Sequence, residues 1–298
     1  MFKGSFVAIV TPFKDGKIDE KKLKELVEWH IAEGTNGFVP SGTTGESATL
    51  SHLEHEKVVE IVVKAVRKRV PVIAGAGSNS TAEAISLSRR AEELGADAVL
   101  SVSPYYNRPT PEGLIAHFTT IAKSVRIPMV LYNIPSRTGV NIAPDTMVLM
   151  VEKAKNIIGV KESAGSVDQA TEIRCKLGDK FLILSGDDSL TLPLMSVGAS
   201  GVISVAANIV PQDVSRLCSL ISEGKFGEAR ELHLKLFPLV KALFLETNPA
   251  PVKAAMKELG LIDEEYLRLP LVQVKDDTRA KIKAAIRNFG VQVPAEKA

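Results

Sequence analysis

Cysteine is scarce in this 298-residue chain: there are two, Cys175 and Cys218, and neither belongs to a C-x-x-C pair. They indicate neither a disulfide framework nor a zinc site, so we expect a cytoplasmic protein. Excess charge is also absent, because 37 Lys and Arg against 35 Asp and Glu give a net charge of +2. This balance argues against a nucleic-acid partner. No apolar run approaches the ~18 residues of a membrane span, so we expect no membrane partner either.

Eight short runs rich in Val and Ile alternate with segments of helical periodicity. The runs are "SFVAIVTP", "NGFVPSG", "VPVIAGAG", "DAVLSVSP", "IPMVLYNIP", "IIGVKES", "FLILSGDD" and "SGVISVAAN". Continuous apolar strands between helices are typical of a parallel sheet that is covered on its faces. Eight such units predict an α/β fold, the (β/α)8 TIM barrel. A dinucleotide-binding sheet is not expected, because "GAGSNS" lacks the G-x-G-x-x-G spacing.

The strand pattern stops at about residue 223, and the segments that follow have helical periodicity. Pro249 and Pro251 mark the beginning of one of these helices, and Gly260 marks its end. We therefore predict a catalytic barrel over 1–223 and a small C-terminal helical region over 224–298.

Lys161 follows a run of apolar and glycine residues at the end of the sixth predicted strand, where Val or Ile is expected. It is adjacent to Glu162, so the two side chains point to opposite faces, and one of them points into the barrel. Active sites of such barrels lie at this end of the strands. A lysine in apolar surroundings retains more neutral amine, which attacks carbonyl carbons and forms Schiff bases. An ion pair to the neighbouring "SGDD" segment is the alternative.

Other polar groups follow the neighbouring strands. Tyr132 could relay protons beside the lysine strand, although packing is the alternative interpretation. Thr43 and Thr44 belong to "GTTGE", which is either an anion-binding turn or an ordinary one. Arg137 in "PSRTG" could bind a substrate carboxylate or form a surface salt bridge.

Two further pairs limit the chemistry. Asp187 and Asp188 would repel a phosphate at a position where barrels commonly bind one, so a small unphosphorylated acid is the expected substrate. His52 and His55 lie three residues apart on a predicted helix, but no third ligand accompanies them. We therefore predict no metal site.

With these residues in hand, the chain resembles the dihydrodipicolinate synthase family of the class I pyruvate aldolases over nearly its whole length. The resemblance lies in "SGTTGESATLSHLEHEKV", "SPYYNRPTPEGLIAHF", "LYNIPSRTG", "IIGVKES", "LSGDD", "GVISVAAN" and "ETNPAPVK". "PYYNRP" with "PSRTG" favours this family over sialic-acid lyases and keto-sugar-acid aldolases, which are the alternatives. A third, less favoured alternative is a barrel that has lost catalysis and acts as a binding protein.

The resemblance implies condensation of pyruvate with L-aspartate 4-semialdehyde to 4-hydroxy-tetrahydrodipicolinate, the committed step of diaminopimelate and lysine biosynthesis. Lys161 would form the imine, Tyr132 would shuttle protons, and Thr43 would link Tyr132 to Tyr106 from a neighbouring subunit of a homotetramer. No metal or organic cofactor is implied.

The resemblance also implies the substrate contacts. Thr44 and the loop amides would hold the pyruvate carboxylate, and Arg137 would bind the carboxylate of the second substrate. Main-chain groups near Gly186 and Ile203 would complete the pocket.

Feedback inhibition by L-lysine is implied as well, at an effector site between subunits. The matching residues are Ser47, Ala48, Leu50, His52, His55, Asn79, Glu83 and Tyr105. The alternative for the two histidines is a solvated helix face.

Overall fold

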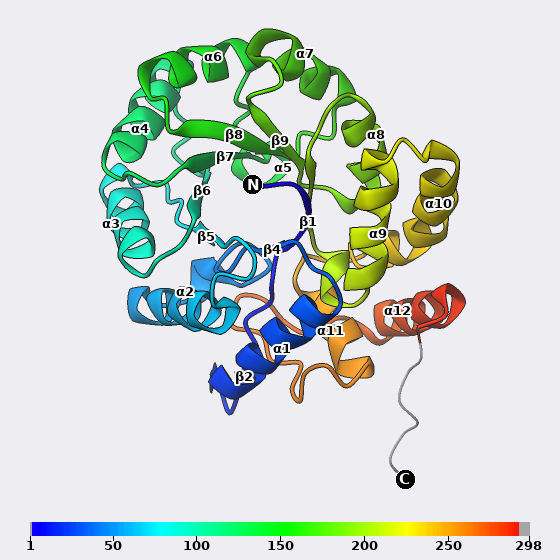
Figure 1. Cartoon of the computed structure of the whole chain (residues 1–298). Coiled ribbons are helices and arrows are strands. Elements are labelled where there is room, and N and C mark those ends of the chain that lie inside the picture. The colour runs from blue at the N-terminus through cyan, green and yellow to red at the C-terminus, as the bar shows by residue number, and fades with distance from the viewer. Residues whose placement is uncertain (1, 292–298) are drawn as a thin grey trace.

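The computed structural model describes residues 2–291, and each of the eight apolar runs contains a strand. The strands lie in the order β4-β1-β10-β9-β8-β7-β6-β5, and all their pairings are parallel. A parallel bridge between Phe38 and Val72 joins β4 to the segment before β5 and completes the ring. The predicted α/β barrel is confirmed (Figure 1). The strands are β1 (Gly4–Val7), β4 (Gly37–Phe38), β5 (Ile73–Gly75), β6 (Ala98–Val102), β7 (Met129–Asn133), β8 (Ile157–Glu162), β9 (Leu182–Ser185) and β10 (Gly201–Ser204).

Helices surround the sheet as an outer ring (Figure 1). Their beginnings follow local sequence signals: Ser51, for example, forms a reciprocal capping box with Glu54 at the start of α2. In the part of the chain described, no helix is both long and apolar enough to cross a membrane. The ring consists of α1 (Glu20–Ala32), α2 (His52–Val66), α3 (Thr81–Glu93), α4 (Pro111–Lys123), α6 (Pro144–Lys153), α7 (Val167–Leu177), α8 (Thr191–Ser196) and α9 (Pro211–Ser222), whereas the short helix α5 (Pro135–Thr138) lies inside it, after β7 (Figure 1).

Short elements complete the loops. They are the antiparallel hairpin β2 (Phe13–Lys14) and β3 (Lys17–Ile18), and the 3-10 turns η1 (Ser47–Thr49), η2 (Asp188–Leu190) and η3 (Ala206–Asn208).

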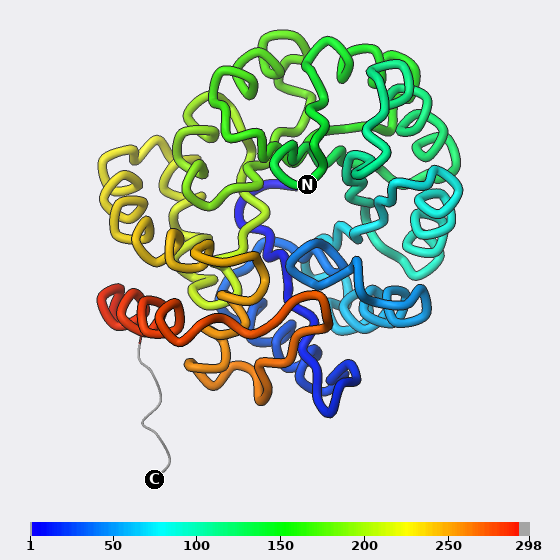
Figure 2. Tube along the Cα trace, turned by 180° about the vertical axis from the view of Figure 1, so that it is seen from behind, coloured from blue at the N-terminus to red at the C-terminus, as the bar shows by residue number. Residues whose placement is uncertain are grey.

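Three C-terminal helices follow the barrel: α10 (Phe226–Ala242), α11 (Ala250–Glu258) and α12 (Asp276–Phe289). α10 packs against α9 and α12, and α11 packs against α12. Figure 2 shows α10 in yellow to gold and the later part of the region, in orange and red, beside the blue N-terminal segments. The predicted C-terminal helices are confirmed, whereas a domain boundary at 223/224 stays a prediction, and 292–298 lie outside the described residues.

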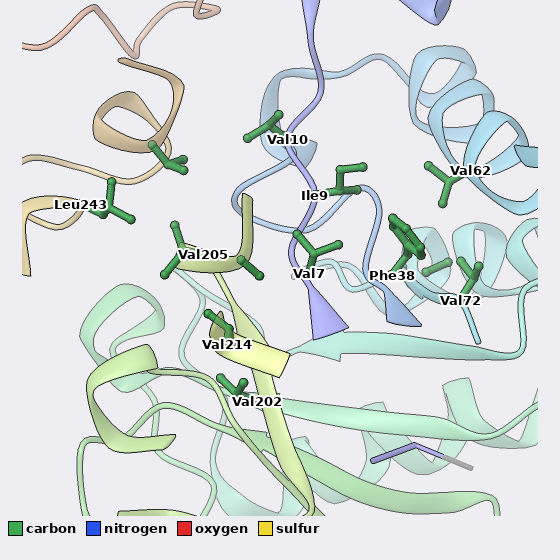
Figure 3. Packing of buried hydrophobic residues seen from close by; sticks show 14 of the residues in the cluster. Val7, Ile9, Val10, Phe38, Val62, Val72, Val202, Val205, Val214 and Leu243 are labelled. Atoms are coloured by element: carbon green, nitrogen blue, oxygen red, sulfur yellow. The ribbon is translucent and has the colours of Figure 1, made fainter. Parts of the chain in front are cut away.

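The strands are buried on both faces because alternate side chains enter two different apolar layers. Phe6 and Ile203 belong to a layer that also contains Tyr132. Their neighbours Val7 and Val202 pack in the larger layer between strands and helices, which Figure 3 shows from close by. A side chain in the first layer therefore points into the barrel, and this alternation decides what Lys161 faces.

Candidate active site

Lys161 lies at the end of β8 and is paired in register with Tyr132 of β7. Since Val160 packs in the outer layer, alternation directs Lys161 into the barrel together with Tyr132. The Lys161 Nζ lies 4.2 Å from the centroid of the Tyr132 ring. Only 7% of Lys161 and 6% of Tyr132 are exposed. An amine is thus held against a phenol ring in a largely dry position.

The buried carboxylate of Asp188, in the acidic segment after β9, does not pair with Lys161. Asp188 instead accepts hydrogen bonds from the Ser204 hydroxyl and from the main-chain N–H groups of Val205 and Ala206, the latter two at 2.9 and 3.1 Å. Burial raises the pKa of Asp188 and of its neighbour Asp187 above the usual range of aspartate. This carboxylate therefore secures the turn after β10, and the alternative ion pair with Lys161 is not formed by Asp188.

Glu162 points to the other face of β8 and has a structural role. It accepts hydrogen bonds from Asn133 Nδ2 at 3.1 and 3.2 Å, from the Ala164 main-chain N–H at 2.7 Å and from Gln169 Nε2 at 3.0 Å. Burial raises the pKa of this carboxyl above its ordinary value. These bonds tie β8 to β7 and to α7, and so fix the strand that carries Lys161.

The "GTTGE" loop after β4 is held in an unusual backbone conformation. Ser41 and Glu46 have φ values of 53° and 58°, in the left-handed region that non-glycine residues rarely adopt. Such strain costs about 1–3 kcal/mol per residue and persists only where the surroundings impose it. Thr11 Oγ1 donates to the Gly45 main-chain oxygen at 2.7 Å, and buried Glu46 pairs with buried Lys253 of α11. The loop that carries Thr43 and Thr44 is therefore fixed from two sides.

Arg137 lies on α5, the short helix that follows β7, and its side chain is exposed. Its Nη2 donates to the main-chain oxygen of Asn248 at 3.2 Å. The side chain of Asn248 donates from Nδ2 to Thr44 Oγ1 at 3.0 Å. One residue from the C-terminal region thus contacts two predicted substrate-binding residues.

A cavity of about 400 Å³ opens at this end of the barrel and brings many of the predicted residues together. Its lining includes Thr43, Tyr132, Arg137 and Asn248. It also includes seven of the eight predicted effector residues, namely Ser47, Ala48, Leu50, His52, His55, Glu83 and Tyr105.

Lys161, Thr44, Gly186 and Ile203 do not line this cavity but lie beside it or beneath it in the barrel. A Cβ atom on Gly186 would lie 1.8 Å from Ser163 Oγ and 3.0 Å from Lys161 Cε. A side chain at this position would therefore displace Ser163 and press on Lys161. Ile203 is fully buried in the inner layer and contributes packing beneath the site.

Tyr106 is the one predicted catalytic residue that a single chain does not bring to the site. It is 93% exposed, has a φ of 70°, and is not part of the cavity lining. The expected link from Tyr132 through Thr43 to Tyr106 is not formed within residues 2–291 of one chain.

Glu83 is the one acidic group among the predicted effector residues. Glu83 Oε1 lies 2.6 Å from His52 Nε2, and its other oxygen accepts from the Ser78 hydroxyl. These two neighbours, Ser78 foremost, lower the pKa of Glu83. Asn79 lies outside the lining and donates from Nδ2 to the Tyr105 main-chain oxygen at 3.3 Å.

The two histidines differ in their surroundings. His55 is buried, which lowers the pKa of its ring, so the solvated-face interpretation is wrong for this residue. The side chain of His52 is 68% exposed. Among the residues described, no group of histidine, cysteine and carboxylate side chains is arranged to hold a metal ion.

Three residues of this site were not singled out by the sequence: Ser78, Asn248 and Lys253. Asn248 and Lys253 come from "ETNPAPVK", in which an Asn-Pro step precedes a helix and a lysine occurs on an otherwise apolar helix face. A lysine among buried alanine, valine and methionine was the signal that could have identified this segment.

Known proteins resemble the chain over nearly its full length. The model of the dihydrodipicolinate synthetase family matches residues 1–289. A 4-hydroxy-tetrahydrodipicolinate synthase from Syntrophus aciditrophicus (strain SB) is 55% identical over 291 residues, which cover 98% of this chain and 99% of that one.

Two solved structures are similar in fold and sequence. A chloride-inhibited dihydrodipicolinate synthase from Acinetobacter baumannii, complexed with pyruvate, is 46% identical with a TM-score of 0.95, covering 98% of this chain and 100% of that one. A structure from Cyanidioschyzon merolae with lysine bound is 38% identical with a TM-score of 0.94, covering 98% and 99%.

Proposed function

The chain belongs to the dihydrodipicolinate synthetase family, and we propose that Lys161 is the residue on which it condenses pyruvate with L-aspartate 4-semialdehyde. The product is 4-hydroxy-tetrahydrodipicolinate, and the reaction is the committed step of diaminopimelate and lysine biosynthesis. The observation that carries the assignment of Lys161 is its buried amine, 4.2 Å from the ring centroid of Tyr132 and directed into the barrel.

The chemistry begins when the neutral amine of Lys161 attacks the keto carbon of pyruvate. The carbinolamine that results loses water and becomes an imine. Loss of a proton from the pyruvate methyl group gives an enamine, whose carbon attacks the aldehyde of the second substrate. The aldehyde oxygen takes up a proton and becomes the hydroxyl of the product. Attack of that substrate's own amine on the imine carbon then releases Lys161 and closes the ring.

These steps move several protons, and Tyr132, whose ring lies against Lys161, would carry them. A phenol can give up and regain a proton without leaving its place, as general acid–base catalysis requires. Thr43 lines the same cavity as Tyr132 and is the next hydroxyl of the proposed relay.

Two anionic groups of the substrates need partners. Thr44 and the main-chain N–H groups of its loop would bind the pyruvate carboxylate, because successive N–H groups of a turn that is fixed in place can bind an anion. The exposed guanidinium of Arg137 would bind the carboxylate of aspartate semialdehyde, for which its planar fork is suited. Main-chain groups near Gly186 and Ile203 would complete the pocket around the imine.

Tyr106 supports the proposal of a homotetramer. Tyr106 has a φ of 70°, which is strained for a residue other than glycine, and it is 93% exposed, so the described part of the chain does not bury its ring. Insertion of this tyrosine into the site of a neighbouring subunit would bury the ring and complete the proton relay from Thr43.

L-Lysine is the proposed inhibitor, and its site would be the Glu83 end of the cavity. The Glu83 carboxylate, whose pKa is lowered, is suited to bind an ammonium group; His52 lies beside it, and Asn79 donates to the main chain of Tyr105, another predicted effector residue. The lysine-bound structure of a relative from Cyanidioschyzon merolae supports the choice of ligand.

Trapping with borohydride tests the role of Lys161, because reduction makes a pyruvate imine irreversible. The protein is incubated with pyruvate and borohydride, digested, and the modified peptide is mapped by mass spectrometry. We expect the adduct on Lys161, with no adduct in Lys161→Met and an unchanged adduct in Lys155→Met, whose lysine is exposed just before the same strand. An adduct on another lysine, or none in the unmodified protein, would overturn the proposal.

A further inference from the structure

Asn248 lies two residues before α11 and connects the two positions that are proposed to bind substrate carboxylates. Its side-chain Nδ2 donates to Thr44 Oγ1 at 3.0 Å, and its main-chain oxygen accepts from Arg137 Nη2 at 3.2 Å. It lines the cavity although only 5% of its surface is exposed. A residue 204 positions away from Thr44 therefore reaches the centre of the site.

The bond to Thr44 fixes the direction in which the threonine hydroxyl can act. A hydroxyl has one hydrogen to donate, and a carboxylate can only accept. Because Thr44 Oγ1 already accepts from Asn248, its own hydrogen is left to donate to a substrate carboxylate. The main-chain oxygen of Asn248 occupies one N–H of Arg137 and leaves the other donors of that guanidinium free.

We infer that Asn248 is a positioning residue of the condensation, an inference that rests on the proposed roles of Thr44 and Arg137. Its side chain keeps the Thr44 hydroxyl a donor toward the pyruvate carboxylate. Its main chain holds Arg137 at the position for the second substrate. The C-terminal region is thus part of the active site through one asparagine.

Fold stability does not account for an asparagine here. Among the residues described, no group bonds to its Oδ1, which is buried. A buried amide oxygen without a partner is unfavourable, and an apolar side chain of similar size would avoid that penalty. The side chain is explained by the orientation of Thr44.

The experiment separates the two substrates. Values of kcat/KM are measured for pyruvate and for aspartate semialdehyde in Asn248→Ala, in Asn248→Asp and in the control Thr247→Ala, whose side chain is exposed next to it. For Asn248→Ala we expect a loss of roughly 5- to 10-fold with pyruvate, the effect of one neutral hydrogen bond. With the semialdehyde we expect a loss below about 2-fold, because the main-chain oxygen that holds Arg137 remains.

Asn248→Asp gives a signature that a purely structural role would not give. An ionised aspartate accepts from the Thr44 hydroxyl and removes the donor for pyruvate, whereas a protonated one can donate as asparagine does. Its kcat/KM for pyruvate, relative to that of the unmodified enzyme, should therefore rise as the pH falls. The same ratio for Asn248→Ala should stay flat.

Borohydride trapping shows whether a negative result contradicts the role of Asn248 or the proposed function itself. If the unmodified protein traps pyruvate on Lys161 and the variants trap it fully at saturating pyruvate, the variants are folded and the kinetic comparison decides. Unchanged kcat/KM for pyruvate, equal losses for both substrates, or an equal loss in Thr247→Ala would overturn the role of Asn248 alone. Failure of the unmodified protein to trap pyruvate on Lys161 would overturn the proposed function and this inference with it.

Discussion

The ion pair between Lys253 and Glu46 joins α11 to the "GTTGE" loop, and its removal should destabilise the protein strongly. Lys253 is 1% and Glu46 3% exposed, and burial lowers the pKa of the lysine. In Lys253→Met the Glu46 carboxylate keeps one hydrogen bond, from the Arg268 main-chain N–H at 3.1 Å, but loses its counter-charge. Breaking a buried pair by removing one partner costs about 3–5 kcal/mol.

The expected loss in the free energy of unfolding of Lys253→Met depends on the contacts that remain around Glu46. Methionine fills much of the lysine volume, so a large cavity is not expected. The contact of Lys253 Nζ with the Phe13 ring, 4.4 Å from its centroid, is lost with the charge. The bond that Glu46 retains places the expected loss toward the lower end, at about 3 kcal/mol in the free energy of unfolding.

Equilibrium unfolding in urea, followed by far-UV circular dichroism, measures this loss. Refolding is checked at the midpoint, and the chain concentration is held fixed because assembly contributes to apparent stability. The control is Lys281→Met, which breaks an exposed pair with Asp277 at 2.9 Å and should cost less than about 0.5 kcal/mol.

The double variant Lys253→Met with Glu46→Gln tests the cause. Because it removes both charges, it should be more stable than Lys253→Met alone, with a coupling of about 1–3 kcal/mol. A loss below about 1 kcal/mol in Lys253→Met, or a double variant that is less stable than either single one, would refute the buried-charge reasoning.

Three further predictions concern catalysis, regulation and pH. Tyr132→Phe should lower kcat by roughly 100-fold or more while borohydride still traps some pyruvate on Lys161, since acid–base catalysis contributes about 10²–10⁴; steady-state assay checks this, and an unchanged kcat would contradict it. Glu83→Ala should abolish inhibition by lysine at unchanged kcat, measured as inhibition curves, and unchanged lysine sensitivity would exclude this site. Burial lowers the pKa of His30 to about 3. Between pH 7 and 5 the unfolded chain, with a histidine pKa of about 6.5, gains a proton that the native state does not, so stability falls by about 2 kcal/mol as the pH falls. Urea unfolding of His30→Gln should show a correspondingly smaller loss over that range, and an equal loss would contradict the assignment.

The barrel was predictable because its strands carry a local signal. Continuous Val and Ile runs occur where both faces are buried, and every run produced a strand in the expected order. The hairpin of β2 and β3 is not among the predicted elements although the sequence signals it, since Asp15 and Gly16 form the turn with φ values of 50° and 72°. Strand alternation also placed Lys161 and Glu162 on opposite faces correctly.

The contacts that complete the site were not predictable in the same way. The bond from Asn248 to Thr44 and the pair of Lys253 with Glu46 join residues 204 and 207 positions apart. Periodicity describes a segment and its own neighbours, and it contains no information on which distant segment will cover a loop. The cytoplasmic location, the tetramer and the domain boundary stay predictions.

One segment, residues 43–50, connects the proposed catalytic and effector positions. Thr43 and Thr44 stand at its beginning, Ser47 and Leu50 at its end, and the strained Glu46 between them is fixed by Lys253. If lysine binds at the proposed effector end, it would act on the pyruvate end by favouring another arrangement of this loop. Linkage then requires that, if lysine weakens the binding of pyruvate through this loop, pyruvate weakens the binding of lysine by the same factor. If the proposed inhibition acts through this loop, the ion pair that holds Glu46 contributes to regulation as well as to stability.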